Sequence, residues 1–235
     1  SASGTLTLTV GYNNTSPSAY SGVIGNGSAT SVSLTKVDSG TLILSGANTY
    51  TGTTTISAGI LKAGSATALG TIDGKTVVSD GAALDLNGQT IANAEPLEIN
   101  GTGASSSGAV YNSSSTAASV GAGAITLITA STIKATSGAI TLSGAITNST
   151  YLLTVDGTYN TTLSGIIGSG AGGLTKNGAG TLTLSGANTF TGQLTVTAGT
   201  LATATVNDSG VNGPLGNSAL SVILGSGSNT GTLQY

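Results

Sequence analysis

Eight carboxylates are the side chains in this sequence that could do chemistry on their own. Two close pairs stand out, Asp80 with Asp85 and Glu95 with Glu98. A glycosidase needs two carboxylates across one bond, one as general acid and one as nucleophile or base. The chain has no Arg to polarise an acidic sugar and no Trp to form a sugar platform. We therefore predict no catalytic residue and assign turn or solvated-face roles to all eight: Asp38, Asp73, Asp80, Asp85, Glu95, Glu98, Asp156 and Asp208.

The composition excludes several other kinds of functional site. The absence of Cys and His excludes zinc, haem and iron–sulfur sites and a Ser-His-Asp triad. Asp73-Gly74 and Asp80-Gly81 are isolated, so the tandem aspartate loops of a calcium-binding repeat are missing. Five scattered lysines and a net charge of −3 argue against a nucleic-acid footprint, and no apolar run approaches a membrane span. We predict no cofactor, no metal, no nucleic-acid partner and no membrane span in this segment.

Two pairs of residues at matching places allow a functional and a structural interpretation. Asn48 and Asn188 could contact a sugar, or their amides could satisfy backbone groups inside the fold, and the second interpretation is favoured. Tyr50 and Phe190 differ only in the hydroxyl, which predicts a packed ring. Glycosylation triplets are frequent, and they become sites only if the producing cell glycosylates exported proteins; examples begin at Asn26, Asn112, Asn148 and Asn160.

The sequence pattern predicts that short strands position these residues. Apolar and polar residues alternate, and Gly, Asn, Ser or Asp bounds each run. No segment carries a helical apolar period, so little or no helix is expected. The 38% hydrophobic content and positive mean hydropathy of +0.30 argue against disorder. The alternating inward positions include Leu6, Leu8, Val10, Leu42, Leu44, Leu84, Leu86, Ile125, Leu127, Ile140, Leu142, Leu182, Leu184, Leu194 and Val196.

The sequence repeats itself. GTLILSGANTYTG at 40–52 returns as GTLTLSGANTFTG at 180–192, and flanking matches lie at slightly larger offsets. A degenerate module of about 140 residues therefore covers about 18–70 and 161–216. A shorter rhythm lies within it, since a glycine followed by small residues and Leu or Ile opens a strand about every 15–22 residues. This predicts the turns of a solenoid.

Stacking explains the composition. In a parallel β-solenoid, equivalent residues of successive turns lie about 4.8 Å apart, so like charges would face one another. Small aliphatic residues inside and Ser or Thr outside stack without conflict. We predict an all-β chain, with Leu42/Leu182, Leu44/Leu184 and Leu61/Leu201 inside equivalent coils. The alternative is a β-sandwich, which needs tight two-residue hairpins that are sparse here.

The block GTLTLSGANTFTGQLTVTAGTL at 180–201 resembles the autotransporter-associated β-strand repeat of bacterial passenger regions, and 40–61 matches as well. The segments LDLNGQTI (84–91) and LGSGSNTGTLQY (224–235) resemble the connecting segments of such passengers. The resemblance implies a right-handed parallel β-helix, export, and display outside the cell or on the bacterial surface.

From these features we expect a non-enzymatic structural segment of a secreted or surface protein, acting as stalk, adhesin or matrix fibre. The alternative is a polysaccharide lyase or hydrolase on the same scaffold. We expect residues 1–235 to form one elongated solenoid segment of a longer chain, because GTLQY joined to SASGTLTLTV continues the strand rhythm. Expected partners are further repeats of the same chain, end-to-end copies, and glycans of host or neighbouring cells.

Overall fold

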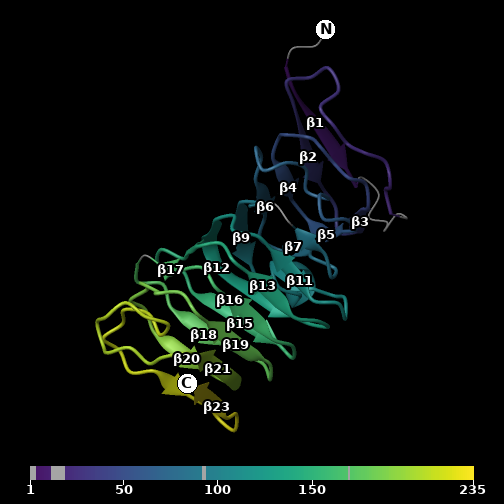
Figure 1. Cartoon of the computed structure of the whole chain (residues 1–235). Coiled ribbons are helices and arrows are strands. Elements are labelled where there is room, and N and C mark those ends of the chain that lie inside the picture. Colours follow the sequence, from purple (N-terminus) through teal and green to yellow (C-terminus); the bar gives the residue numbers. More distant parts are fainter. Residues whose placement is uncertain (1–3, 12–18, 92–93, 169) are drawn as a thin grey trace.

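The computed structural model describes residues 4–11, 19–91, 94–168 and 170–235. They form a parallel β-solenoid of about nine turns of about 22 residues each (Figure 1). Within these ranges the helical content is one 3-10 turn, η1 (Ala104–Ser106). The predicted all-β solenoid with little or no helix is confirmed. In the same ranges, no helix has the length and apolar character needed to cross a membrane.

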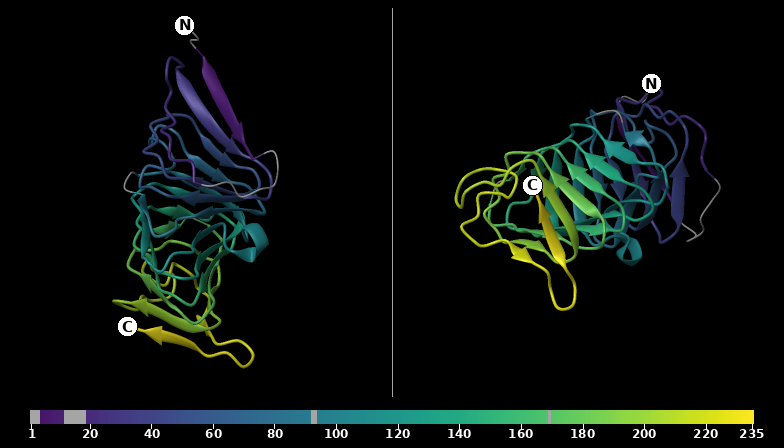
Figure 2. Two further views of the ribbon diagram at one scale, coloured as in Figure 1. Left: turned by 90° about the vertical axis from the view of Figure 1, so that its right-hand side faces the viewer. Right: turned by 60° about the horizontal axis from the view of Figure 1, so that its bottom comes forward.

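The strands form three faces, and Figure 2 shows successive turns side by side along the axis. The first face carries β1 (Thr5–Val10), β2 (Ser31–Lys36), β4 (Thr54–Ile56), β6 (Thr76–Val78), β9 (Leu97–Gly101), the start of β12 (Ile125–Ala135), β14 (Ile146–Thr147) and β17 (Ile167–Gly168). The second face carries β3 (Thr41–Leu44), β5 (Gly59–Ala63), β7 (Ala82–Asp85), β10 (Val110–Asn112), the end of β12, β15 (Leu153–Gly157), β18 (Leu174–Lys176), β20 (Leu194–Val196) and β22 (Ile223–Leu224). The third face carries β8 (Thr90–Ile91), β11 (Ala118–Val120), β13 (Ile140–Leu142), β16 (Thr161–Leu163), β19 (Thr181–Leu184), β21 (Gly199–Thr203) and β23 (Gly231–Gln234).

The length of a turn follows from the residues paired across it. Leu42 pairs with Leu61, 19 residues later, and Leu34 pairs with Thr54. Longer turns occur where a loop is inserted, as between Leu97 and its partner Ile125. The average of about 22 residues lies at the upper end of the predicted range, because each turn completes three faces before the chain pairs with itself again, and turns with an inserted loop exceed that range.

The apolar interior is continuous along the axis. The alternating leucines of both motif copies are buried, with exposed fractions of at most 4%: Leu42, Leu44, Leu61, Leu182, Leu184 and Leu201. This confirms the predicted inward positions of both copies. The prediction is wrong for Leu6 and Leu8, which are 52% and 42% exposed. Strand β1 pairs with β2 in the described part of the chain, so no further turn covers these two leucines.

The second motif copy is shifted by one face relative to the first: β2–β5 lie on the first and second faces, and β18–β21 lie on the second and third. Starting from β2, the first face runs through β4, β6, β9, β12 and β14 to β17. The second copy begins one face further on, in β18, which pairs with β15 on the second face. An offset of about 140 residues thus corresponds to six turns and one face. The same motif serves two different sides of the solenoid, so its role cannot depend on which way it points.

The continuity of the interior predicts the effect of a buried charge. Leu184 is fully buried in β19, between Leu163 and Thr203 of the adjacent turns. We expect Leu184→Asp to lower the free energy of unfolding by more than about 3 kcal/mol, because the carboxylate would enter a dry interior. Denaturant unfolding followed by circular dichroism measures the change.

The matched control is Thr183→Asp. Thr183 is the outward neighbour of Leu184, and its cross-turn partners Thr162 and Ala202 carry no charge. We expect a change within about 1 kcal/mol. Equal losses in the two variants would show that the inward and outward assignments of β19 are wrong.

Candidate functional site

The carboxylate pairs singled out by the sequence are separated in the fold. Asp80 lies exposed in a turn, whereas Asp85 is 1% exposed. Glu95 is 2% exposed, whereas Glu98 lies on the outward side of β9 with Lys75 Nζ at 2.6 Å. The turn or solvated-face prediction is right for Asp80 and Glu98 and wrong for Asp85 and Glu95. Each of the two buried carboxylates has its own hydrogen-bond donors, so neither pair works as an acid dyad.

Asp85 is the centre of a polar cluster on the second face. Lys62 Nζ lies 3.4 Å from Asp85 Oδ2 and donates to Ser113 Oγ at 2.9 Å. Ser113 Oγ donates to Asp85 Oδ2 at 2.5 Å. The backbone N–H groups of Asn87 and Ser113 donate to Asp85 Oδ1. Because the carboxylate oxygens are engaged by these donors, Asp85 holds the cluster in place and is not positioned to activate Ser113 as a nucleophile.

This cluster is part of a longer row that we call the charged ladder. It consists of outward residues paired across five successive turns of the second face: Lys62, Asp85, Tyr111, Lys134 and Asp156. Lys134 Nζ lies 3.3 Å from Asp156 Oδ2, so each lysine of the ladder faces a carboxylate. Burial raises the pKa of Tyr111, and the neighbouring Asp85 carboxylate raises it further. The ladder alternates in sign where stacking would otherwise place like charges together.

Beside the charged ladder runs a row of four threonines. Thr132 pairs with Thr154, Thr154 with Thr175, and Thr175 with Thr195. These side chains are outward and half-buried. The second face therefore presents neutral hydroxyls beside paired charges, a surface suited to hydrogen bonding and without a reactive group.

Two lysines point into the solenoid. Lys36 and Lys176 are each 2% exposed. Lys176 Nζ donates to the carbonyl oxygens of Asn177, Gly178 and Ala198, and Lys36 Nζ makes the three equivalent bonds. Burial lowers the pKa of both ammonium groups, and the carboxylates of Asp156 and Asp38 oppose that change. Each lies two residues after a buried leucine, Leu34 or Leu174, so the alternation along the strand points its side chain inward.

The repeated asparagines hold successive turns together. Asn48 Oδ1 accepts the backbone N–H of Ile24, and its Nδ2 donates to Ala68 O in the next turn. Asn188 makes the equivalent bonds to Ile167 N and Pro214 O. The structural interpretation of these two amides is confirmed.

Tyr50 and Phe190 fill the interior, as predicted, and both rings are fully buried. Each packs against a glycine with a positive φ, Gly70 or Gly216, where a Cβ would collide with the ring. The hydroxyl of Tyr50 lies 2.5 Å from Thr54 Oγ1. The residue that matches Thr54 in the second copy is Leu194. The first copy therefore has two hydroxyls, on Tyr50 and Thr54, where the second copy has two apolar side chains.

The glycosylation triplets differ in access. Asn112 and Asn148 are fully buried, and Asn112 bonds Gly88, Ser114, Thr116 and Ala139. Asn160 is exposed, with its Oδ1 accepting the N–H of Thr181, and Asn26 is half-buried. In the folded chain, Asn160 is therefore the most accessible of the four amides.

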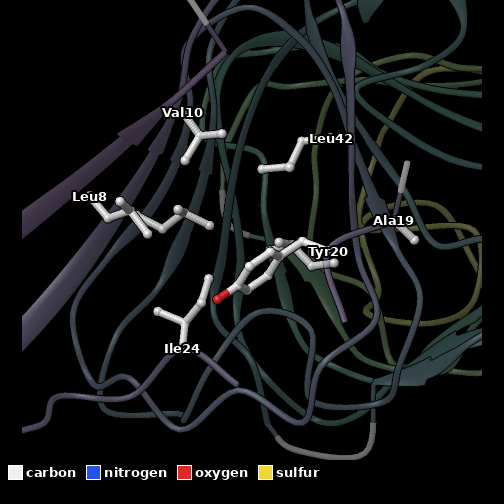
Figure 3. Close-up of a pocket in the computed structure, with 8 residues that line it drawn as sticks. Leu8, Val10, Ala19, Tyr20, Ile24 and Leu42 are labelled. Atoms are coloured by element: carbon white, nitrogen blue, oxygen red, sulfur yellow. The ribbon is translucent and has the colours of Figure 1, made fainter. Parts of the chain in front are cut away.

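An apolar hollow lies at the N-terminal opening of the solenoid. Its volume is about 420 Å³, and its lining is apolar: Leu8, Val10, Ala19, Tyr20, Ile24, Leu34, Leu42 and Leu44. Figure 3 shows the side chains of Leu8, Val10 and Leu42 around this opening. None of the described residues that line it is a carboxylate or a lysine, so these residues form a surface for apolar packing. Across the described ranges, no group of three or more acidic, His or Cys side chains could hold a metal ion.

Comparisons with known proteins identify the repeated motif. Residues 34–63 and 174–202 each match the passenger-associated-transport-repeat family, which confirms the resemblance predicted from the motif. The matched segments are the two copies that run through β2–β5 and β18–β21.

A curated relative is similar over part of the chain. It is described as the adhesin BmaC autotransporter of Brucella suis biovar 1 (strain 1330), and it is 39% identical over 75 residues, which is 32% of this chain. The aligned part is 2% of that relative's length, so this chain corresponds to a small fraction of it. No solved structure matches the chain significantly.

The buried lysines predict a large effect of removing one ammonium. We expect Lys176→Met to lower the free energy of unfolding by about 2–4 kcal/mol, because three carbonyl oxygens would lose their charged donor. Lys75→Met is the control, since its ammonium is half-exposed and faces one surface carboxylate; we expect less than about 1 kcal/mol there. Equal losses of unfolding free energy in the two variants would contradict a stabilising role of the three carbonyl oxygens around Lys176 Nζ.

The hydroxyl pair predicts coupling between two positions. Tyr50→Phe removes one donor, and Thr54→Leu leaves the Tyr50 hydroxyl buried without its partner, so each single change should cost about 1–2 kcal/mol. The double variant recreates the pair at Phe190 and Leu194, and we expect it to recover about 1 kcal/mol relative to the sum. A double-mutant cycle on unfolding free energies measures this coupling. Strict additivity would mean that the two hydroxyls do not depend on each other.

Proposed function

We propose that this chain is a non-enzymatic segment of a passenger region displayed outside the cell or on the bacterial surface. One observation carries the proposal: the two segments that match the passenger-associated-transport repeat are equivalent turns of one parallel solenoid. Similarity to an autotransporter adhesin over 75 residues supports the same role.

The physical contribution of the segment is its length along the solenoid axis. Each turn advances the chain by one strand spacing of about 4.8 Å, so about nine turns extend over about 40 Å. Backbone hydrogen bonds run parallel to the axis on three faces and resist bending. A solenoid of this kind holds a binding region away from the cell, and the stalk, adhesin and matrix-fibre roles share this property.

The outer surface favours weak, repeated contact. Threonine hydroxyls recur at the turn spacing on the second face, and the charged ladder beside them carries balanced charges. Hydroxyls in regular rows suit hydrogen bonding to glycans of host or neighbouring cells, and repetition adds avidity. The apolar N-terminal opening suits packing against another turn, from further repeats of the same chain or from a second copy.

The alternative function is a polysaccharide lyase or hydrolase. The environments of Asp85 and Glu95 disfavour it, since one carboxylate is engaged by donors and the other is buried away from the surface. Release of reducing sugars from pectin or alginate by the purified chain would favour the enzyme over the passenger segment.

Surface display is tested on the producing cells. Antibodies against the exposed region around Tyr159 and Asn160 should label intact cells that carry the full-length protein. Cells with an in-frame deletion of this segment should adhere less under flow while still displaying an epitope elsewhere in the protein. Labelling only after permeabilisation would contradict display, and unchanged adhesion would contradict a role of this segment in reach.

A further inference from the structure

Glu95 is a buried carboxyl that no role above explains. It lies where the chain passes from the third face to β9 of the first face, and it is 2% exposed. Thr76 Oγ1 donates to Glu95 Oε1 at 2.8 Å. The backbone of this corner is in close contact with the next turn, because a Cβ on Gly123 would lie 2.1 Å from Glu95 O.

The carboxyl ends a row of interior hydroxyls. Thr54 and Thr76 are cross-turn partners, both fully buried, in a column that is otherwise occupied by Leu34 and Leu97. Thr54 donates to Leu69 O at 3.2 Å and lies 2.5 Å from the hydroxyl of Tyr50. Polar groups therefore replace leucine in two successive turns, next to the one carboxyl placed inside this part of the solenoid.

No cation compensates Glu95 in the described part of the chain around it. Tyr50 is the titratable group that faces it from the interior. Lys75 and Glu98 pair with each other on the outside of the first face, and Asp73 is exposed in the preceding turn. Residues 118–124, which pack beneath the corner, include no titratable side chain.

We propose that Glu95 is a protonation-dependent clamp: as a neutral carboxyl it holds the corner between the turns of β6 and β9, and as a carboxylate it loosens that corner. A neutral carboxyl can remain inside the solenoid and accept from Thr76. An ionised one needs water, which it reaches only if residues 94–96 move outward. Two backbone hydrogen bonds border the segment that would move: Leu97 N–H donates to Ala124 O, and Thr76 N–H donates to Pro96 O.

The direction of the pH dependence follows from the environment. Burial raises the pKa of Glu95 from 4.5 to about 7, and the hydrogen bond from Thr76 acts in the opposite direction. A raised carboxyl pKa means that the folded state holds the proton more tightly than the unfolded chain does. The stability contribution is therefore complete below about pH 4.5 and is lost as the pH rises through about 7.

The test compares the whole chain with Glu95→Gln between pH 4.5 and pH 8.5. We expect the unfolding equilibrium constant of the parent to rise over this range, relative to that of the variant, by roughly two orders of magnitude. Glutamine stays neutral and can still accept from Thr76, so it removes this component alone. Glu98→Gln is the control, and it should retain the pH dependence of the parent because Glu98 is outside.

Hydrogen exchange and carbon NMR locate the effect. Above pH 7, the amides of Thr76 and Leu97 should exchange faster in the parent and not in the Glu95→Gln chain. Selective labelling should show one glutamate carboxyl titrating near neutrality, a readout that remains available if the variant fails to fold. Parallel pH profiles of parent and variant, or two glutamates that both titrate in the ordinary acidic range, would overturn the clamp.

Discussion

Between the end turns of the described solenoid, inward side chains are covered above and below by the equivalent side chains of the adjacent turns, and the rest of the structure depends on that stacking. The distance between turns is fixed by backbone hydrogen bonding at about 4.8 Å, so the interior cannot widen to admit a poorly matched group. Leucine, isoleucine and valine stack on their own kind and fill the space. The low content of charged and aromatic residues, 6% and 3%, follows from this constraint.

Several polar groups that enter the interior are held there by the backbone. Asn48 and Asn188 each join three successive turns through their amides, and Lys36 and Lys176 each donate to three carbonyl oxygens. These groups lie at corners, where the chain changes face and its carbonyl groups leave the strand ladder. They satisfy backbone groups that would otherwise be buried without partners, and so they allow a chain with few charges to turn three corners in every turn.

Much of this fold could be predicted from the sequence because stacking makes it locally periodic. Alternation identified the inward leucines, and the matched copies identified the turns. The two copies also correspond beyond the motif, where the offset between them is larger. Gly70 and Gly216 contact the rings of Tyr50 and Phe190 in the same way. The two failures among the alternating leucines share one cause. Leu6 and Leu8 alternate correctly, yet burial also requires a covering turn, which alternation does not report.

The charged groups were predicted less well, because their environment depends on residues one or two turns away. Ser113 is 51 residues from Lys62 in the sequence, and the loop lengths between them decide whether the two meet. Turn lengths vary, and an error of one residue in the assumed register would exchange the inward and outward residues of a strand. Asp85 alternates with Leu84 and Leu86 as an outward residue should, but neighbouring side chains cover it.

The shift of one face between the two motif copies separates the requirements of folding from those of recognition. The motif spans the first and second faces in one copy and the second and third faces in the other, so it contributes interior packing and corner bonds that do not depend on the direction it faces. A binding partner approaches from one side, so it must read outward residues that the motif does not set. In the described chain those include the part of the charged ladder from Asp85 to Asp156 and inserted loops such as Gly101–Gly108, where five residues have positive φ: Gly101, Gly103, Ser105, Ser106 and Gly108. Because these features lie outside the shared motif, outward residues and loops can change while the stacked interior that holds them stays the same.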